Sequence, residues 1–256
     1  MAIRGKLAVV CGGASGIGRA MALDLVNQGA KVVVMDIDLA SMQAMQKKSP
    51  TLIYYPLDVT DLKAVQSVFM QVEKEHGPIF RLVHTAAIMP AATFRQMSIE
   101  QTINVMTVNY EGMVHVTQTV LPFLLSRNEG QIVVMGSVAG VLPLARFGAY
   151  GASKAATNFY MEVLQAEHAG SQVQLLLVCP AAVDTPLIDQ AIEHGPWFLR
   201  KQKNGFRIAS TKQIIKAIER GLQTKKSKIY PGDAWLIQFL YRLFPSLSRW
   251  VGQKLS

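Results

Sequence analysis

LAVVCGGASGIGRAMALDLVNQG, residues 7–29, is the stretch that determines the fold. It opens with the continuous apolar run Leu7–Cys11, which has the composition of a strand buried on both faces. Glycines follow at once, and residues 18–28 then predict a helix that ends at Gly29, because glycine suits the position after a helix C-terminus. A buried strand, a glycine-rich turn and a helix in this order predict the first unit of an α/β fold.

Strand-like and helix-like segments continue to alternate along the rest of the chain. The other expected strands cover residues 31–35, 52–55, 80–84, 131–135 and 173–178, with a short last strand at 228–230. The expected helices cover residues 39–47, 61–75, 99–126 and 149–168. Pro122 is expected to bend the long helix or to mark its last turns. This order predicts a doubly wound parallel sheet flanked by helices in a single domain, 1–256, with residues 186–210 as a substrate lid.

The composition favours a folded chain in a reducing compartment. Half of the 256 residues are hydrophobic, which is enough to fill a sizeable core and argues against disorder. Cys11 and Cys179 lie in apolar, strand-like runs, so we expect buried free thiols rather than a disulfide, and no metal site. No signal peptide is visible, and no run approaches the roughly 20 apolar residues that span a bilayer. We therefore expect a cytoplasmic protein.

The net charge of +9 is concentrated in the last quarter of the chain. Residues 198–256 carry 13 basic and 2 acidic residues, a net charge of +11, which indicates either an anionic partner or a solvated basic helix face. The tail, residues 235–256, is amphipathic: large apolar side chains alternate with Arg242, Arg249 and Lys254, and Pro245 divides it into two expected short helices. We rank packing over the pocket or against a sister subunit, in a homodimer or homotetramer, first and peripheral membrane contact second. No nucleic-acid partner is expected, because no recognition module is apparent.

The glycine-rich turn has the features of a phosphate-binding loop. Its spacing is Gly-x3-Gly-x-Gly, and the N–H groups at the helix start favour the negative charge of a pyrophosphate. Its expected cofactor-binding residues are Gly12, Ser15, Gly16, Ile17 and Gly18. No Gly-Lys-Ser/Thr follows, which disfavours a nucleoside triphosphatase.

Carboxylates after the second and third strands suggest which dinucleotide the loop takes. Asp36 follows the second strand and can accept hydrogen bonds from the ribose hydroxyls of an adenosine, whereas it would repel a 2′-phosphate. This favours NAD over NADP, although an ordinary loop aspartate is the alternative. Asp58 and Val59, after the third strand, are placed to touch the adenine.

Tyr150 and Lys154 lie four residues apart on a predicted helix and therefore share a face. A phenol with a pKa of about 10 is a poor base at neutral pH, and a nearby ammonium is expected to lower that pKa. Ser137 ends the fifth strand, so its hydroxyl can reach the ligand crevice and stabilise developing charge on a substrate oxygen. An exposed helix pair without chemistry is the alternative.

Together these residues resemble the short-chain dehydrogenase/reductase family over about residues 6–186. The motifs that carry the resemblance are GGASGIG, Asp36, Asn109, Ser137, Tyr150-Gly-Ala-Ser-Lys154 and Pro180-Ala-Ala-Val-Asp-Thr185. The resemblance implies a Rossmann-type single domain and a Ser-Tyr-Lys centre. It also implies that Asn109 interrupts the long helix and holds a water that links Lys154 to solvent, and that Thr185 and the backbone of Val183 hold the nicotinamide carboxamide.

The chain departs from the family pattern at a few positions. The family's Asn-Asn-Ala-Gly after the fourth strand reads His84-Thr85-Ala86-Ala87, of which Ala86 is an expected cofactor contact and His84 an expected packed strand-end histidine. Cys11 stands where the family has threonine, and Ala181 where it has glycine. The four catalytic positions are intact.

These observations predict an NAD(H)-dependent oxidoreductase that moves a hydride between nicotinamide and an alcohol/ketone carbon, with Tyr150 as general acid/base. A lipophilic substrate is expected because the segments that should line its pocket are apolar. Their expected lining residues are Ile88, Met89, Pro90, Val141, Leu142, Leu144, Phe147, Leu187, Ile188, Trp197 and Phe198. The alternatives are a catalytically silent dinucleotide-binding scaffold or redox sensor, against which the intact catalytic positions argue, and a peripheral membrane lipid-binding protein on the same fold.

Overall fold

Seven parallel strands form one sheet in the computed structural model, which describes residues 3–192 and 208–246. The strands lie in the order β3-β2-β1-β4-β5-β6-β7. Their bounds are β1 Leu7–Cys11, β2 Lys31–Asp36, β3 Ile53–Pro56, β4 Ile79–His84, β5 Gly130–Met135, β6 Val173–Val178 and β7 Lys228–Ile229. The strand order reverses direction between β1 and β4, and in such sheets the ligand crevice opens at the carboxyl ends of these two strands.

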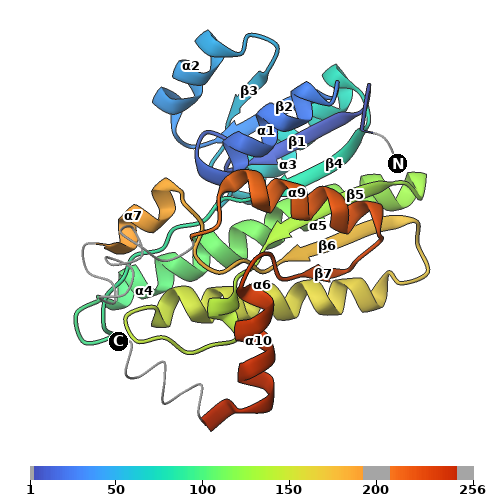
Figure 1. Ribbon diagram of the computed structural model, residues 1–256. Coiled ribbons are helices and arrows are strands. Elements are labelled where there is room, and N and C mark those ends of the chain that lie inside the picture. The colour runs from blue at the N-terminus through green and yellow to red at the C-terminus, as the bar shows by residue number, and fades with distance from the viewer. Residues whose placement is uncertain (1–2, 193–207, 247–256) are drawn as a thin grey trace.

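Helices cover both faces of the sheet (Figure 1). One core layer packs under α1 (Gly16–Asn27), α2 (Leu39–Lys48) and α9 (Thr211–Gln223). The other packs under α3 (Leu62–His76), α5 (Gly112–Arg127) and α6 (Gly148–Glu167). Within β1, Ala8 and Val10 belong to the first layer and Val9 and Cys11 to the second, because successive side chains of a strand point to opposite faces. The doubly wound, Rossmann-type α/β fold is thereby confirmed.

The predicted long helix is present but is not regular. It runs as α4 (Ile99–Met106), a π-helical turn η1 (Thr107–Glu111) and α5, and Asn109 lies in the π-helical turn. A π-helical turn inserts an extra residue into the helix and often marks a functional position. Pro122 lies inside α5 near its end and does not terminate it, and Asn128 closes the helix in a left-handed conformation with φ 48°.

Parts of the predicted lid and tail fall outside the described residues. The lid begins as the helix α7 (Pro186–Ile192), and residues 193–207, with Trp197 and Phe198, are not described. The tail begins as the helix α10 (Ala234–Leu243), and the second helix expected after Pro245 lies mostly beyond the described residues. Both cysteines are buried free thiols, as expected.

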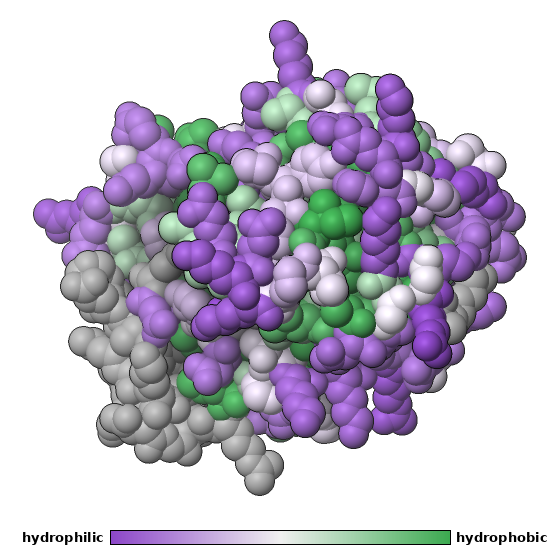
Figure 2. Space-filling view, turned by 90° about the horizontal axis from the view of Figure 1, so that it is seen from above, coloured by the Kyte–Doolittle hydropathy of each residue, from purple (hydrophilic) through white to green (hydrophobic). Residues whose placement is uncertain are grey.

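The surface seen from above is mainly hydrophilic around a central group of hydrophobic side chains (Figure 2). Large hydrophobic side chains are also exposed elsewhere, among them Ile99 and Ile103 of α4, Phe159 of α6 and several residues of α10. Among the described residues, no helix is long and apolar enough to cross a membrane.

A buried polar network joins α9 to the amino ends of three central strands. Arg81 of β4 is only 1% exposed; its Nε donates to Gln131 Oε1 of β5 over 2.7 Å, and its guanidinium pairs with the Glu219 carboxylate of α9. Gln131 donates in turn to Gln174 of β6, which donates to the carbonyl of Leu222. Because Arg81 has no access to water, its charge depends on Glu219.

We therefore expect Glu219→Gln to lower the free energy of unfolding by about 3 kcal/mol, since it leaves a buried guanidinium without its counter-charge. Urea unfolding of the full chain measures this. Glu167→Gln, an exposed carboxylate at the end of α6, is the matched control and should change stability by less than about 0.5 kcal/mol. Equal stability of the two variants would show that the pair does not support the sheet.

Candidate active site

The glycine-rich loop after β1 packs directly on the segment after β4. Gly12 has φ +75°, and a side chain at this position would collide with the backbone of Ala86. A side chain at Gly18 would collide with the carbonyl of Gly12 and the hydroxyl of Thr85. The Thr85 hydroxyl donates to the carbonyls of Cys11 and Gly12 over 2.9 and 3.0 Å, so it ties the loop to β4. Sequence reasoning missed this role of Thr85.

The start of α1 offers unpaired backbone donors at the same edge of the sheet. Ser15 is the N-cap residue, but its side chain makes no capping hydrogen bond, so the first N–H groups of the helix remain available. A side chain at Gly16, which has φ +52°, would come within 3.3 Å of the Thr185 side chain. The glycines let a ligand come close to the backbone, and the helix N-terminus offers N–H groups to it. Both features suit the pyrophosphate of a dinucleotide. Ile17, in the first turn of α1, is half-buried.

Asp36 is fixed beside this loop at the end of β2. Its Oδ2 accepts from the backbone N of Ala14 over 2.9 Å, and its Oδ1 accepts from the N of Asp38 over 3.1 Å. A carboxylate can accept about four hydrogen bonds, so Asp36 keeps acceptor capacity for ribose hydroxyls. Ile37, which follows it, is 69% exposed and offers a flat apolar contact for an adenine.

The two residues expected at the adenine differ in accessibility. Asp58 is exposed after β3, where its carboxylate accepts from the N and the hydroxyl of Thr60. The Val59 side chain is buried against Gly112 of α5, and its carbonyl is bonded to His115 Nδ1. Val59 therefore supports this edge mainly by packing, while Asp58 lies open beside it.

Ser137, Tyr150 and Lys154 come together at the carboxyl ends of β5 and β6. All three are buried, and the Ser137 side chain lies close enough to the Tyr150 hydroxyl to lower its pKa. Lys154 Nζ lies 5.8 Å from the centre of the Tyr150 ring and donates to the carbonyl of Met135 over 2.8 Å. The expected Ser-Tyr-Lys group is thus assembled in one place, with η2 (Val138–Gly140) directly after Ser137.

Burial dominates the acidity of this group in the chain without ligands. Desolvation raises the pKa of Tyr150 to about 12, against the hydrogen bond from Ser137, which lowers it. Desolvation also lowers the pKa of Lys154 to about 8. Burial sets the direction of this shift, and the Lys154 ammonium donates to the carbonyl of Met135; the expectation that Lys154 lowers the pKa of Tyr150 stays a prediction. Tyr150 is poised as a neutral proton donor.

Asn109 uses its side chain to join the π-helical turn to the segment after β4. Its Oδ1 accepts from the N of Ile88 over 2.8 Å, and its Nδ2 donates to the Ile88 carbonyl and to Ser153 Oγ. Ser153 lies next to Lys154 on α6, so Asn109 links three parts of the site. The interruption of the helix at Asn109 is confirmed, whereas its water-holding role stays a prediction.

His84, at the end of β4, is a buried histidine without a hydrogen-bond partner. It is 2% exposed, and neither ring nitrogen is bonded to another described residue. Burial, and then the positive charge of Lys154, lower its pKa to about 3, so the ring is neutral. Within the described ranges it belongs to no cluster of three or more side chains able to hold a metal ion.

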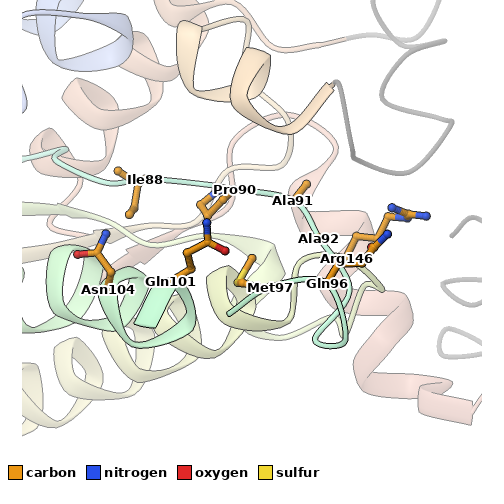
Figure 3. Close-up of a pocket in the computed structure, with 9 residues that line it drawn as sticks. All are labelled: Ile88, Pro90, Ala91, Ala92, Gln96, Met97, Gln101, Asn104 and Arg146. Atoms are coloured by element: carbon orange, nitrogen blue, oxygen red, sulfur yellow. The ribbon is translucent and has the colours of Figure 1, made fainter. Parts of the chain in front are cut away.

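The segment 88–92 is a wall between two apolar regions. Met89 and Ala91 pack around Tyr150, while Ile88 and Ala92 pack toward α4. A cavity of about 620 Å³ opens on the α4 side (Figure 3). It is lined by Ile88, Pro90, Ala91, Ala92, Gln96, Met97, Gln101, Asn104 and Arg146.

The wall divides the residues expected to line the substrate pocket. Met89, Leu144, Phe147 and Ile188 pack with Tyr150, and the ring of Phe147 meets the Tyr150 ring edge-on at 6.3 Å. Ile88 and Pro90 instead line the cavity next to α4, which Ala91 and Ala92 also border.

Residues 6–195 match the family model of the short chain dehydrogenases. The chain is 32% identical to a 3-oxoacyl-[acyl-carrier-protein] reductase of Thermotoga maritima over 197 residues, which is 75% of this chain and 80% of the relative. It is 29% identical over 234 residues to the 2,3-dihydro-2,3-dihydroxybenzoate dehydrogenase of Bacillus subtilis, which covers 89% of this chain and 82% of the relative.

Solved structures show the same architecture. A short-chain dehydrogenase/reductase from Burkholderia phymatum, in complex with NAD, superposes with a TM-score of 0.85 at 25% identity and covers 97% of both chains. The closed form of a serine dehydrogenase complexed with NADP+ superposes with a TM-score of 0.79 at 22% identity, over 87% of this chain and 94% of the other. At that identity the second likeness concerns the fold alone.

The burial of His84 predicts a pH dependence of stability. Its pKa is about 3 when folded and 6.5 for the ordinary group, so below pH 6.5 only the unfolded chain binds a proton there. Stability is therefore complete above pH 6.5 and falls by about 1.4 kcal/mol per pH unit toward the folded-state pKa. Urea unfolding at a series of pH values should give a shallower slope for His84→Asn than for wild type and the control His168→Asn. Identical slopes would contradict the assignment.

Proposed function

The chain belongs to the short-chain dehydrogenase/reductase family, and on this premise we propose that it is an NAD(H)-dependent oxidoreductase acting on an alcohol/ketone carbon of a lipophilic substrate. The family binds a nicotinamide dinucleotide in a Rossmann fold, and the uncapped N–H groups in the first turn of α1, after Ser15, suit its pyrophosphate. The observation that carries the proposal is the buried group of Ser137, Tyr150 and Lys154, which lies at the same edge of the sheet as the glycine-rich loop.

The choice of NAD rests on Asp36. Its carboxylate lies against the glycine-rich loop, through the hydrogen bond from Ala14, where the ribose of an adenosine would approach. A negative charge there repels a 2′-phosphate and accepts from the free hydroxyls of NAD. Ile37 beside it and Asp58, which follows the neighbouring strand β3, complete the proposed adenosine site, while Thr185 and the backbone of Val183 hold the carboxamide.

Each residue of the catalytic group has one role in the proposed reaction. When bound, the nicotinamide supplies the hydride acceptor or donor. The Tyr150 hydroxyl gives a proton to the substrate oxygen in reduction and takes it back in oxidation, while the Ser137 hydroxyl donates a hydrogen bond to the same oxygen. Lys154 places a positive charge near Tyr150 and favours its phenolate once the proton has left. Asn109 holds the Ile88 segment and a water for proton exchange with solvent.

The surroundings of Tyr150 support a lipophilic substrate. Phe147 and Ile188 are buried around the Tyr150 ring, and Met89 and Leu144 complete an apolar lining. Such a lining excludes water and binds apolar carbon rather than sugars or small acids. We further propose that the protein is a homodimer or homotetramer. We also propose a cytoplasmic location, with which the buried free thiols agree.

Tyr150→Phe should abolish nearly all turnover and leave NAD affinity unchanged, because it removes only the proton-transfer group. Turnover is followed by NADH absorbance with a panel of lipophilic alcohols and ketones, and affinity by calorimetry. Tyr160→Phe, on the same helix, is the control and should keep wild-type turnover. Activity of Tyr150→Phe within a few-fold of wild type would remove Tyr150 from the mechanism.

Asp36→Ala should reduce the preference for NAD(H) over NADP(H), since it removes the charge that repels a 2′-phosphate. Calorimetry with both dinucleotides measures the ratio of affinities. Asp38→Ala, the next carboxylate along the chain, should leave this ratio unchanged. A wild-type protein that binds NADP(H) more tightly would refute the choice of cofactor.

A further inference from the structure

The helix α10 turns its large apolar side chains away from the body of the protein. Trp235, Leu236, Phe239, Leu240 and Leu243 are 58, 43, 52, 44 and 53% exposed. Their spacing of i, i+1, i+4, i+5 and i+8 places them on one face of the helix, which we call the α10 stripe. A continuous apolar stripe of this kind marks an interaction surface, unlike single exposed hydrophobic residues.

The opposite side of α10 faces the protein. Ala234 is buried, and Ile237, Gln238 and Tyr241 are half-buried. Gln238, which has a buried carboxamide oxygen, therefore lies on the inner side while the apolar stripe lies outside. This is the reverse of a helix that uses its most apolar face to join the core.

The α10 stripe lies close to the catalytic loop. α10 packs against η2, the turn that directly follows Ser137. In Figure 1, α10 projects from the body of the protein below α6. Whatever binds the α10 stripe therefore lies next to the loop that carries a catalytic residue.

The charge of this end of the chain indicates the chemistry of the partner. From Ala234 to Ser256 there are three basic residues, Arg242, Arg249 and Lys254, and no acidic one. A two-fold contact between two copies of this segment would bring like charges together, whereas an anionic lipid surface complements them. Tryptophan, present in the α10 stripe as Trp235, is one of the aromatic residues that membrane interfaces favour.

We propose that the α10 stripe docks this protein on an anionic phospholipid membrane, with α10 lying in the interface and its apolar side chains among the upper acyl chains. The helix is too short to span a bilayer, so the contact is peripheral and reversible. Through η2, docking holds the Ser137 loop beside the lipid surface. The docking does not depend on turnover, so it is tested by binding alone.

The test is co-sedimentation of the full chain with phosphatidylcholine vesicles that contain no phosphatidylserine or about 30% of it. Wild type should bind the anionic vesicles at least about tenfold more tightly, and should lose this advantage when salt rises from about 0.1 M to about 1 M. The triple variant Leu236→Gln/Phe239→Gln/Leu243→Gln should bind about tenfold more weakly. The control Ile99→Gln/Ile103→Gln, which alters equally exposed apolar residues on α4, should bind like wild type.

Native mass and thermal unfolding of the same variants separate docking from its alternatives. If the triple variant loses oligomer mass while vesicle binding is unchanged, the α10 stripe is a subunit interface and the proposal is overturned. If wild type binds neither vesicle, it is overturned as well. If the triple variant fails to fold, the Arg242→Gln variant provides the test. It should bind the anionic vesicles more weakly than wild type and the neutral vesicles equally well. Binding of the anionic vesicles as tight as that of wild type would refute the proposal.

Discussion

The close approach of two backbone segments sets the geometry of this protein. The loop after β1 can lie against Thr85 and Ala86 only because Gly12 and Gly18 carry no side chains. Thr85 secures that contact with two hydrogen bonds to backbone carbonyls. As a result the start of α1 faces an open crevice at the carboxyl edge of the sheet, and Asp36 and Ser137 reach the same edge from β2 and β5. The proposed cofactor site and the Ser137-Tyr150-Lys154 group therefore share one support.

Burial determines the acidity of the proposed catalytic group, Ser137, Tyr150 and Lys154. Tyr150 lies among apolar side chains, which favour the protonated form of its hydroxyl. The Lys154 ammonium donates a hydrogen bond to the Met135 carbonyl. Asn109 fixes the wall of the pocket to the helix below it, at the cost of an irregular turn. The π-helical turn places the Asn109 amide where it reaches both Ile88 and Ser153.

Much of the fold could be predicted from the sequence because buried parallel strands are continuous apolar runs with sharp ends. The strand Val173–Val178 was predicted to the residue, whereas helix boundaries shifted by one or two positions. The grouping of Ser137, Tyr150 and Lys154 could be predicted from spacing and resemblance, and their catalytic roles stay predictions. Three features could not, since each depends on neighbours distant in sequence. These are the hydrogen bond from Thr85 to the glycine-rich loop, the placement of Ile88 and Met89 on opposite sides of the segment 88–92, and the raised pKa of Tyr150.

The central claim is that this chain moves a hydride to or from a substrate carbon while Tyr150 moves the proton. The most direct measurement is single-turnover reaction of the protein with NADH deuterated at the reactive nicotinamide carbon and a panel of lipophilic ketones, followed by mass spectrometry of the products. The account predicts an alcohol that carries deuterium on its carbinol carbon. A protein that binds NADH yet leaves it and every ketone unchanged would contradict the account and point to a dinucleotide-binding scaffold.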